Sequence, residues 1–216
     1  MLTKNFNFNC LKPIYRDRVI PSSNDVLNII WNGDANNSSG YSQGARDFLF
    51  ALNENPRINL QYTRKICVKS DGIDKSLNDK IMAIANNKIG TPYISVVYNI
   101  ANRFFIDPKA VLNIGYTVFE CEKIPQYLIP SCNQMDAIFT PTQFSKRIIE
   151  KNGVIVPIFV IPYCHEIERF ENVGKYNIKN LKGFNFLFLS EMTPRKGWDH
   201  LVQAFVEEFG VGEDVS

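Results

Sequence analysis

Three short segments of the chain carry residues that could bind or polarise a ligand. The first, NGDANNSSGYSQG, contains Gly40 and Gly44 and leads into a helical pattern. Glycines let backbone N–H groups approach a ligand closely, and the positive N-terminus of the following helix favours an anion. The second segment, FECEKIP, contains Glu120 and Glu122, whose carboxylates could accept hydrogen bonds from ligand hydroxyls. The third, TPRKG at residues 193–197, is a cationic turn.

Each segment also has a purely structural interpretation. A glycine pair is common in flexible turns, and this one lacks the G-x-G-x-x-G spacing of dinucleotide-binding loops. Glu120 could cap a helix or pair with a lysine, because acids on loops are usually solvated. The turn with Arg195 and Lys196 would alone most often be exposed to solvent. Because this turn lies between an apolar run and the pattern W-D-x-L-x-x-A-F, it is a more specific signal for a ligand contact than its residues alone.

Strand and helix patterns that alternate along the chain must position these segments. Apolar, branched and aromatic runs predict strands at 26–31, 58–62, 66–68, 93–98, 111–118, 136–140, 154–161 and 184–190. Apolar residues at helical spacing predict helices at 45–54, 77–85, 143–152 and 198–209. The alternation predicts an α/β fold with a Rossmann-like, doubly wound parallel sheet. Ligands of such sheets bind beyond the carboxyl ends of the strands, where the loops that follow strands lie.

Three other residues have a stronger structural explanation than a functional one. Thr142 suits the N-cap of the helix predicted at 143–152, and Gly153 suits its C-terminal end. His165 is one of only two histidines in the chain, and a lone histidine is more often structural than catalytic. A structural role is already a sufficient reason for each of these residues, and a cleft-facing position of Thr142 stays open.

Changes in composition predict where the chain divides. Residues 1–25 are polar and interrupted by prolines, which is typical of an N-terminal extension. Residues 26–162 would form one complete domain. Residues 163–183 lose periodicity and gain charge, so we interpret them as a linker. Residues 184–216 would begin a second domain.

The composition argues against several classes of protein. The 24 basic and 22 acidic residues form no basic stripe, so we expect no nucleic-acid partner. Five scattered cysteines without a C-x-x-C pair do not favour a zinc site or a disulfide framework. Asp34 and Asp136 stand alone, so no D-x-D metal motif is present. The chain has no signal peptide and no long apolar span, which predicts a cytoplasmic protein, or one peripheral at a membrane surface.

Four stretches of the sequence together resemble the group 1 (family 4) glycosyltransferases. These stretches are NIGYTVFECEKIP, SCNQMDAIFTPTQFSKRIIEKNGV, PIFVIPYCHEIERF and FLFLSEMTPRKG. The resemblance is strong over residues 113–153 and 186–209, and elsewhere it is a matching order of elements. The chain departs from the family pattern at three positions. Phe119 replaces a tryptophan, Cys164 replaces a glycine, and Glu191 stands where the family commonly has an arginine.

The resemblance implies a GT-B fold, in which two Rossmann-like domains face each other. Contacts to the donor diphosphate would come from the cationic turn and the glycine loop, at Lys196, Arg195, Gly40 and Gly44. The acceptor and sugar cleft would be lined by Tyr41, Ser42, Glu120 and Glu122. No catalytic residue is assigned. No metal is expected, because the D-x-D motif is missing, and no cofactor is expected, because the nucleotide-sugar is itself a substrate. Lys196 and its neighbour would stabilise the negative charge that develops on the departing nucleoside diphosphate.

The implied reaction is transfer of a hexose from a nucleotide-sugar to a sugar, lipid-linked or protein acceptor, with retention of configuration. The family's E-x7-E acidic pair has no counterpart within 184–216, so we expect a fragment that is inactive alone. An apolar strand face left open in its incomplete second domain would favour self-association. Two alternatives stay open: a non-catalytic nucleotide- or sugar-binding module, and an epimerase with the same two-domain fold. The segment ECEKIP argues against the epimerase.

Overall fold

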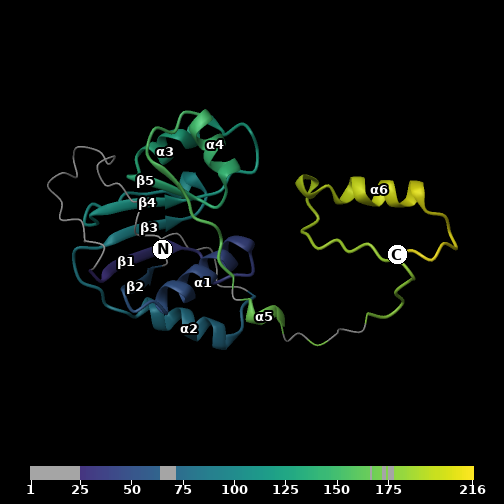
Figure 1. Ribbon diagram of the computed structural model, residues 1–216, viewed down its shortest axis with the longest axis horizontal. Helices are drawn as coiled ribbons and strands as arrows, with labels where there is room; N and C mark the ends of the chain where they lie inside the picture. Colours follow the sequence, from purple (N-terminus) through teal and green to yellow (C-terminus); the bar gives the residue numbers. More distant parts are fainter. Residues whose placement is uncertain (1–24, 64–71, 166, 172–173, 175–177) are drawn as a thin grey trace. The chain divides into compact units, whose positions relative to one another are not determined.

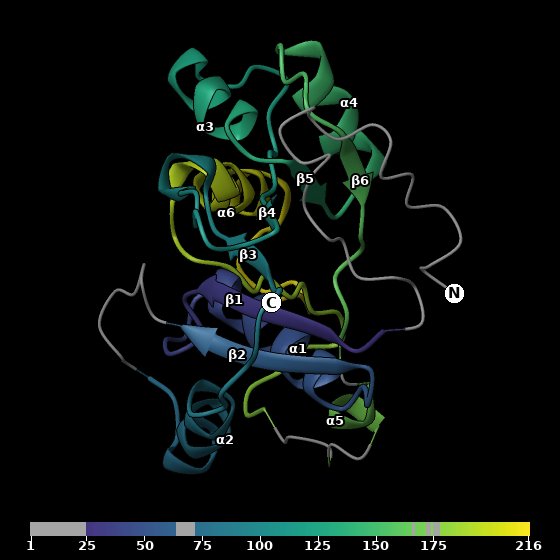
Figure 2. The ribbon, with the colours of Figure 1, turned by 90° about the vertical axis from the view of Figure 1, so that its left-hand side faces the viewer.

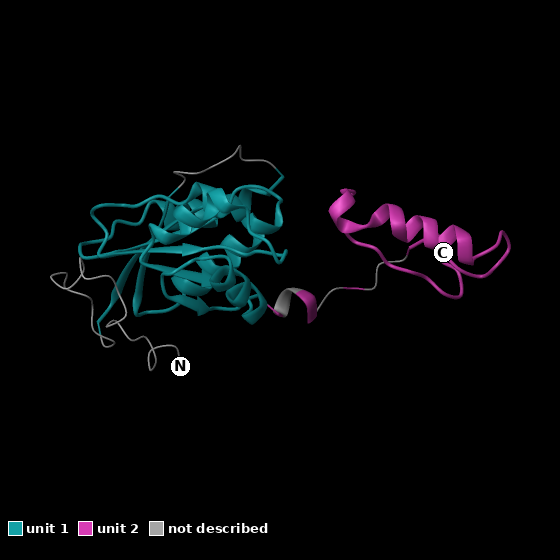
Figure 3. Ribbon diagram, turned by 90° about the horizontal axis from the view of Figure 1, so that it is seen from above, with its two compact units in different colours: residues 1–166 teal, residues 167–216 magenta. Residues whose placement is uncertain are grey.

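The structure, a computed structural model, describes residues 25–63, 72–165, 167–171, 174 and 178–216. The chain divides into two compact units, residues 1–166 and 167–216 (Figure 3). Except for Asp25, the predicted N-terminal extension lies outside the described residues, and so does the strand predicted at 66–68.

A six-stranded, entirely parallel sheet forms the centre of the first unit (Figures 1 and 2). The spatial order of its strands is β2-β1-β3-β4-β5-β6. The strands are β1 (Leu27–Gly33), β2 (Ile58–Thr63), β3 (Ile94–Tyr98), β4 (Leu112–Tyr116), β5 (Ala137–Thr140) and β6 (Ile158–Val160). From β1 the chain first adds β2 on one side and then β3 to β6 on the other. This confirms the predicted doubly wound, Rossmann-like α/β fold.

Helices cover both faces of this sheet (Figure 2). On one face lie α1 (Gly40–Asn53) and α2 (Lys75–Ala85), and on the other α3 (Ile129–Asn133) and α4 (Gln143–Lys151). Neighbouring residues of one strand belong to opposite cores, because side chains alternate across a sheet. Tyr98 packs with α1 and α2, whereas Val97 packs with α3 and α4. Burial on both faces explains why the strands read as continuous apolar runs.

The strand predicted at 154–161 is shorter than expected, because β6 begins only at Ile158. The N–H of Ile155 donates to Oδ1 of Asn133 at 2.8 Å instead of joining the sheet. Pro157 has no N–H to offer to the sheet. Thr142 caps α4 as predicted, and Gly153, at φ +101°, follows the helix end.

The second unit contains α5 (Glu168–Glu171), the 3-10 turn η5 (Pro194–Lys196) and α6 (Trp198–Glu208). The buried strand predicted at 184–190 is wrong. Within the described residues this segment forms a single parallel bridge, between Phe184 and Val215, and the side chains of Leu187 and Leu189 are 78% and 84% exposed. A strand needs hydrogen-bonded neighbours along its length, and an apolar run does not supply them. No helix in the described residues is long and apolar enough to cross a membrane.

Candidate ligand site at the carboxyl edge of the sheet

The carboxyl ends of β1 and β3 meet where the strand order reverses. Gly33, the last residue of β1, is paired in register with Tyr98, the last residue of β3. A Cβ atom at position 33 would lie 3.0 Å from the carbonyl oxygen of Tyr98, so the two strand ends approach as closely as glycine allows. In doubly wound sheets this reversal point is where ligands bind. The strand order that creates it is not readable from the sequence.

The helix after β1 begins earlier than predicted. The sequence placed residues 32–44 in a loop, but α1 already begins at Gly40. Ser39 is the N-cap, and its Oγ accepts a hydrogen bond from the N–H of Ser42 at 3.2 Å. The Ser42 hydroxyl, 3.3 Å from that of Ser39, is buried beneath the first turn. The connection is therefore only residues 34–39, which we call the β1–α1 loop.

The two glycines of the predicted ligand segment differ in their surroundings. A Cβ atom at Gly40 would meet no atom within 4 Å, so the first turn of α1 is open there. At Gly44 a Cβ atom would collide with the hydroxyl of Tyr98. Packing against Tyr98 thus explains Gly44 without any ligand. A diphosphate contact at either glycine stays a prediction.

Side chains from neighbouring elements fix the shape of the β1–α1 loop. The hydroxyl of Tyr62 accepts from the N–H of Ala35 at 3.1 Å and lies 2.9 Å from Oδ1 of Asn36. Arg46 of α1 donates from Nη1 to the carbonyl oxygens of Ala35 and Asn37, at 2.8 and 2.7 Å. These bonds come from β2 and α1, so both neighbouring elements hold the loop.

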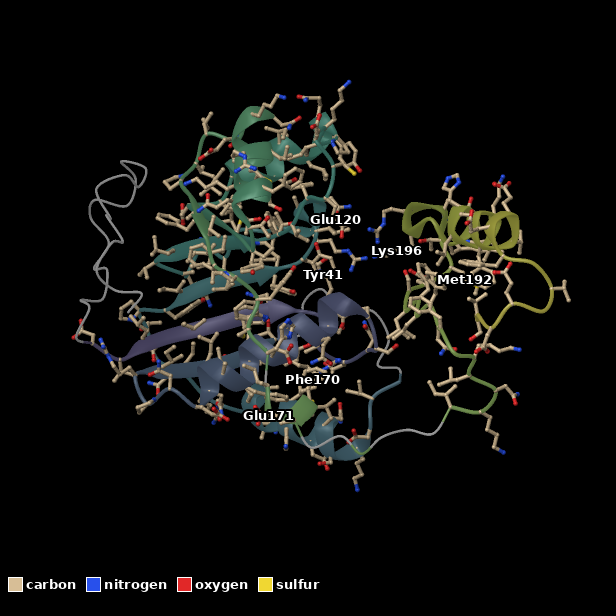
Figure 4. All side chains as sticks on the ribbon, turned by 45° about the vertical axis from the view of Figure 1, so that its right-hand side comes forward. Tyr41, Glu120, Phe170, Glu171, Met192 and Lys196 are labelled. Carbon is tan, nitrogen blue, oxygen red and sulfur yellow. The ribbon has the colours of Figure 1, made fainter. Side chains whose placement is uncertain are left out.

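Tyr41 joins the start of α1 to the loop after β4. Its phenol lies close to Thr117 and Val118, which partly offset the effect of burial on its pKa. Burial raises the pKa of Tyr41 to about 12, and the nearby Tyr163 and Glu120 add to the rise. The phenol is therefore neutral and able to donate a hydrogen bond at physiological pH. Figure 4 shows Tyr41 and Glu120 at this edge of the first unit, so the structure brings these two predicted residues together.

A cluster of tyrosines below Tyr41 was not predicted. Tyr98 and Tyr116 end β3 and β4 at paired positions, with ring centroids 5.0 Å apart. The ring of Tyr163 packs against that of Tyr116 with centroids 5.9 Å apart, and the Tyr116 hydroxyl donates to the carbonyl of Ile161 at 2.7 Å. Burial raises the pKa of Tyr98 and of Tyr116 far above the ordinary value. The available signal in the sequence was a tyrosine in each of two consecutive predicted strands, at the end of 93–98 and near the end of 111–118.

Glu122 lies on the α4 side of the same loop. Its backbone carbonyl accepts a hydrogen bond from Nδ2 of Asn152 at 3.0 Å, and Oδ1 of Asn152 accepts from the N–H of Ile124 at 3.1 Å. The Glu122 side chain itself is exposed. Asn152, at the end of α4, thus anchors the segment that carries both predicted acids.

His165 has a specific partner that sequence reasoning did not find. Its Nδ1 lies 2.8 Å from Oδ2 of Asp47 on α1, although the two residues are 118 positions apart. The His165 side chain is 60% exposed and that of Asp47 only 5%. This pair fastens the segment that follows β6 onto α1.

In the second unit, the predicted cationic turn is placed directly before a helix. Lys196 ends η5, and Gly197, with φ of +68°, is the N-cap of α6. The side chains of Arg195 and Lys196 are exposed (Figure 4 labels Lys196). Because a helix N-terminus is itself positive, this turn combines two cations with a partial positive charge.

Comparisons of the chain with protein-family models, with curated proteins and with solved structures found no match. Over the described ranges, no cluster of three or more histidine, cysteine, aspartate or glutamate side chains could hold a metal ion.

Proposed function

We propose that this chain belongs to a nucleotide-sugar-dependent glycosyltransferase of the GT-B type. Its first unit would be the acceptor-side domain, and its second unit would carry the beginning of the donor-side domain. The supporting observation is the cationic turn of Arg195 and Lys196 at the N-terminus of α6. It follows an extended segment, and the chain returns parallel to that segment at Val215, as in a βαβ unit.

The reaction would place its developing negative charge at this turn. As the bond between the anomeric carbon and the phosphate oxygen breaks, the nucleoside diphosphate leaves with the bonding electrons. The Lys196 ammonium and the N–H groups of the first turn of α6 would stabilise that charge. A hydroxyl of the acceptor would form the new bond to the anomeric carbon and pass its proton to the departing diphosphate. Tyr41 and Glu120 would orient sugar hydroxyls, one as a donor and the other as an acceptor of hydrogen bonds.

A non-catalytic binding module is the second candidate. Two departures from the family pattern favour it: Glu191 where the family commonly has a cation, and Cys164 in place of a glycine. Such a module would bind nucleoside diphosphates without turning over nucleotide-sugars in any context.

Calorimetry and a transfer assay together test these proposals. We expect the chain to bind a nucleoside diphosphate, and Lys196→Ala to weaken binding by about tenfold or more, since charge-assisted contacts are worth about 1.5–3 kcal/mol. Lys182→Ala, at another exposed lysine of the same unit, is the matched control. If neither nucleoside diphosphates nor nucleotide-sugars bind, or if Lys196→Ala binds as tightly as wild type, the donor-site proposal fails.

The transfer assay addresses activity and partners. We expect the 216-residue chain to show little or no transfer from nucleotide-sugars to sugar, lipid-linked or protein acceptors, and robust transfer would refute this expectation. Transfer by the parent enzyme that is lost in Lys196→Ala would favour the transferase over the binding module. Retention of configuration, independence of metal ions, and action in the cytoplasm or at a membrane surface are parts of the same proposal. Self-association through the exposed apolar residues of the second unit would appear in light scattering as a mass above that of one chain.

A further inference from the structure

A chain of side-chain hydrogen bonds begins at the β1–α1 loop and runs along α1. Arg46 holds the loop carbonyls from Nη1, as described above, and donates from Nη2 to Oε1 of Gln43 at 2.9 Å. Gln43 donates from Nε2 to Oδ1 of Asp47 at 2.7 Å. The second carboxylate oxygen of Asp47 faces His165. The side chains of Arg46, Gln43, Asp47 and His165 therefore connect without interruption.

This network of hydrogen bonds ends at the segment that leaves the sheet after β6. We call residues 161–165 the exit segment, since the polypeptide passes from it into the second unit. Two other contacts hold the exit segment at separate points: the Tyr116 hydroxyl on the carbonyl of Ile161, and the packing of the Tyr163 ring on that of Tyr116. The His165 contact continues through side chains to the β1–α1 loop.

Only one orientation of the Gln43 amide and the His165 ring matches every donor to an acceptor in this hydrogen-bond network. Arginine can only donate, and a carboxylate can only accept. The amide of Gln43 must therefore turn its oxygen to Arg46 and its NH₂ group to Asp47, because the reverse orientation would give two repulsive contacts. Nδ1 of His165 must likewise carry the hydrogen. Arg46 and Asp47 are largely buried, where charge-assisted hydrogen bonds are stronger than in water.

We propose that Gln43 and Asp47 are positioning residues that couple the β1–α1 loop to the exit segment. When His165 is docked on Asp47, the amide of Gln43 is held against Arg46, and Arg46 holds the loop carbonyls. When His165 leaves, Asp47 loses the donor at Oδ2, and the constraint on Gln43 and Arg46 weakens. If the proposed function is correct, occupation of the loop by a ligand would in turn tighten the exit segment, because coupling between two sites is reciprocal.

Hydrogen exchange of the whole chain tests this coupling without any ligand. In His165→Ala, we expect exchange to accelerate about tenfold both in the exit segment and at residues 34–39, because the lost bond is charge-assisted. Gln43→Met keeps the length of the side chain but removes the amide that links Arg46 to Asp47. It should therefore give the same acceleration of exchange at 34–39. His200→Ala, on the exposed surface of α6, should change neither region.

A second variant separates coupling from general loosening. Tyr116→Phe removes a different contact of the exit segment, the hydrogen bond to the carbonyl of Ile161, and leaves the Arg46–Gln43–Asp47–His165 network intact. It should accelerate exchange in the exit segment and leave 34–39 unchanged. If His165→Ala leaves 34–39 unchanged, or if Tyr116→Phe disturbs that loop equally, the coupling through side chains is refuted. The failure of every nucleoside diphosphate to bind would refute the proposed function and leave these exchange results interpretable.

Discussion

Gly44 of α1 lies directly against the hydroxyl of Tyr98, the last residue of β3. Tyr98 is 1% exposed and stacked on Trp31, so it cannot move aside. We predict that Gly44→Ala destabilises the protein by about 1–3 kcal/mol, the usual cost of overpacking a core. A urea denaturation midpoint that falls by the corresponding amount would be the confirming measurement.

Gly40 provides the matched control on the same helix. A Cβ atom there meets nothing within 4 Å, and alanine is the better helix former. Gly40→Ala should therefore be neutral or stabilise by up to about 1 kcal/mol. If both substitutions destabilise equally, the close approach of Tyr98 to Gly44 is not the reason for the glycine.

The strands of the sheet could be predicted well because burial on both faces gives them continuous apolar runs. The start of α1 could not. GYSQG is polar and contains two glycines, and Asn37, Ser38 and Ser39 are all residue types that cap helices. Tertiary contacts decide among them: Tyr98 packs on Gly44 and Arg46 ties the loop to the helix.

The cap of α4 gives a second prediction on stability. Oγ1 of Thr142 accepts a hydrogen bond from the N–H of Ser145 at 3.0 Å. Thr142→Ala leaves that donor without its cap and should cost about 1 kcal/mol. Thr142→Ser keeps the oxygen and should retain most of the stability in the same thermal unfolding experiment. Equal losses in both variants would mean that the methyl group, and not the cap, matters at this position.

The candidate site could be predicted only in part. Gly40, Tyr41 and Glu120 were placed at one edge of the sheet because they follow strands, and the structure brings Tyr41 near Glu120. The pair of Asp47 and His165 had no local signal, since its members are 118 residues apart. Likewise, the apolar composition of 184–190 predicted burial, yet burial depends on partners that no local pattern specifies.

Glu191 offers a gain-of-function prediction that rests on the proposed donor site. It precedes the cationic turn, at a position where the resembling family commonly has an arginine. Glu191→Arg replaces a repulsive charge by an attractive one, and we expect nucleoside diphosphates to bind about 2–10-fold more tightly. Glu207→Arg makes the same change in net charge near the other end of α6 and is the control. Equal effects in calorimetry would indicate general attraction, and weaker binding in Glu191→Arg would count against the assignment of this turn.

The buried thiol of Cys132 predicts a loss of stability at alkaline pH. Burial raises the pKa of Cys132 from 9.0 to about 12, so the folded state disfavours the thiolate. Below pH 9 both folded and unfolded chains keep this proton, and the stabilisation is fully present. As the pH rises from 9 towards 12, the unfolded chain loses the proton that the folded chain retains, which lowers the free energy of unfolding by about 1.4 kcal/mol per pH unit.

Comparing variants isolates this contribution from those of the tyrosines. Between pH 8 and pH 10, the wild-type chain should lose about 1.4 kcal/mol more stability than Cys132→Ala. Cys121 is exposed, so Cys121→Ala should follow the wild-type pH dependence. Alkylation at pH 8, read out by peptide mass, should label Cys121 in the native chain and leave Cys132 unmodified until unfolding. A native Cys132 that reacts as fast as Cys121 would show that α3 opens at that position and that the thiol is not held in the core.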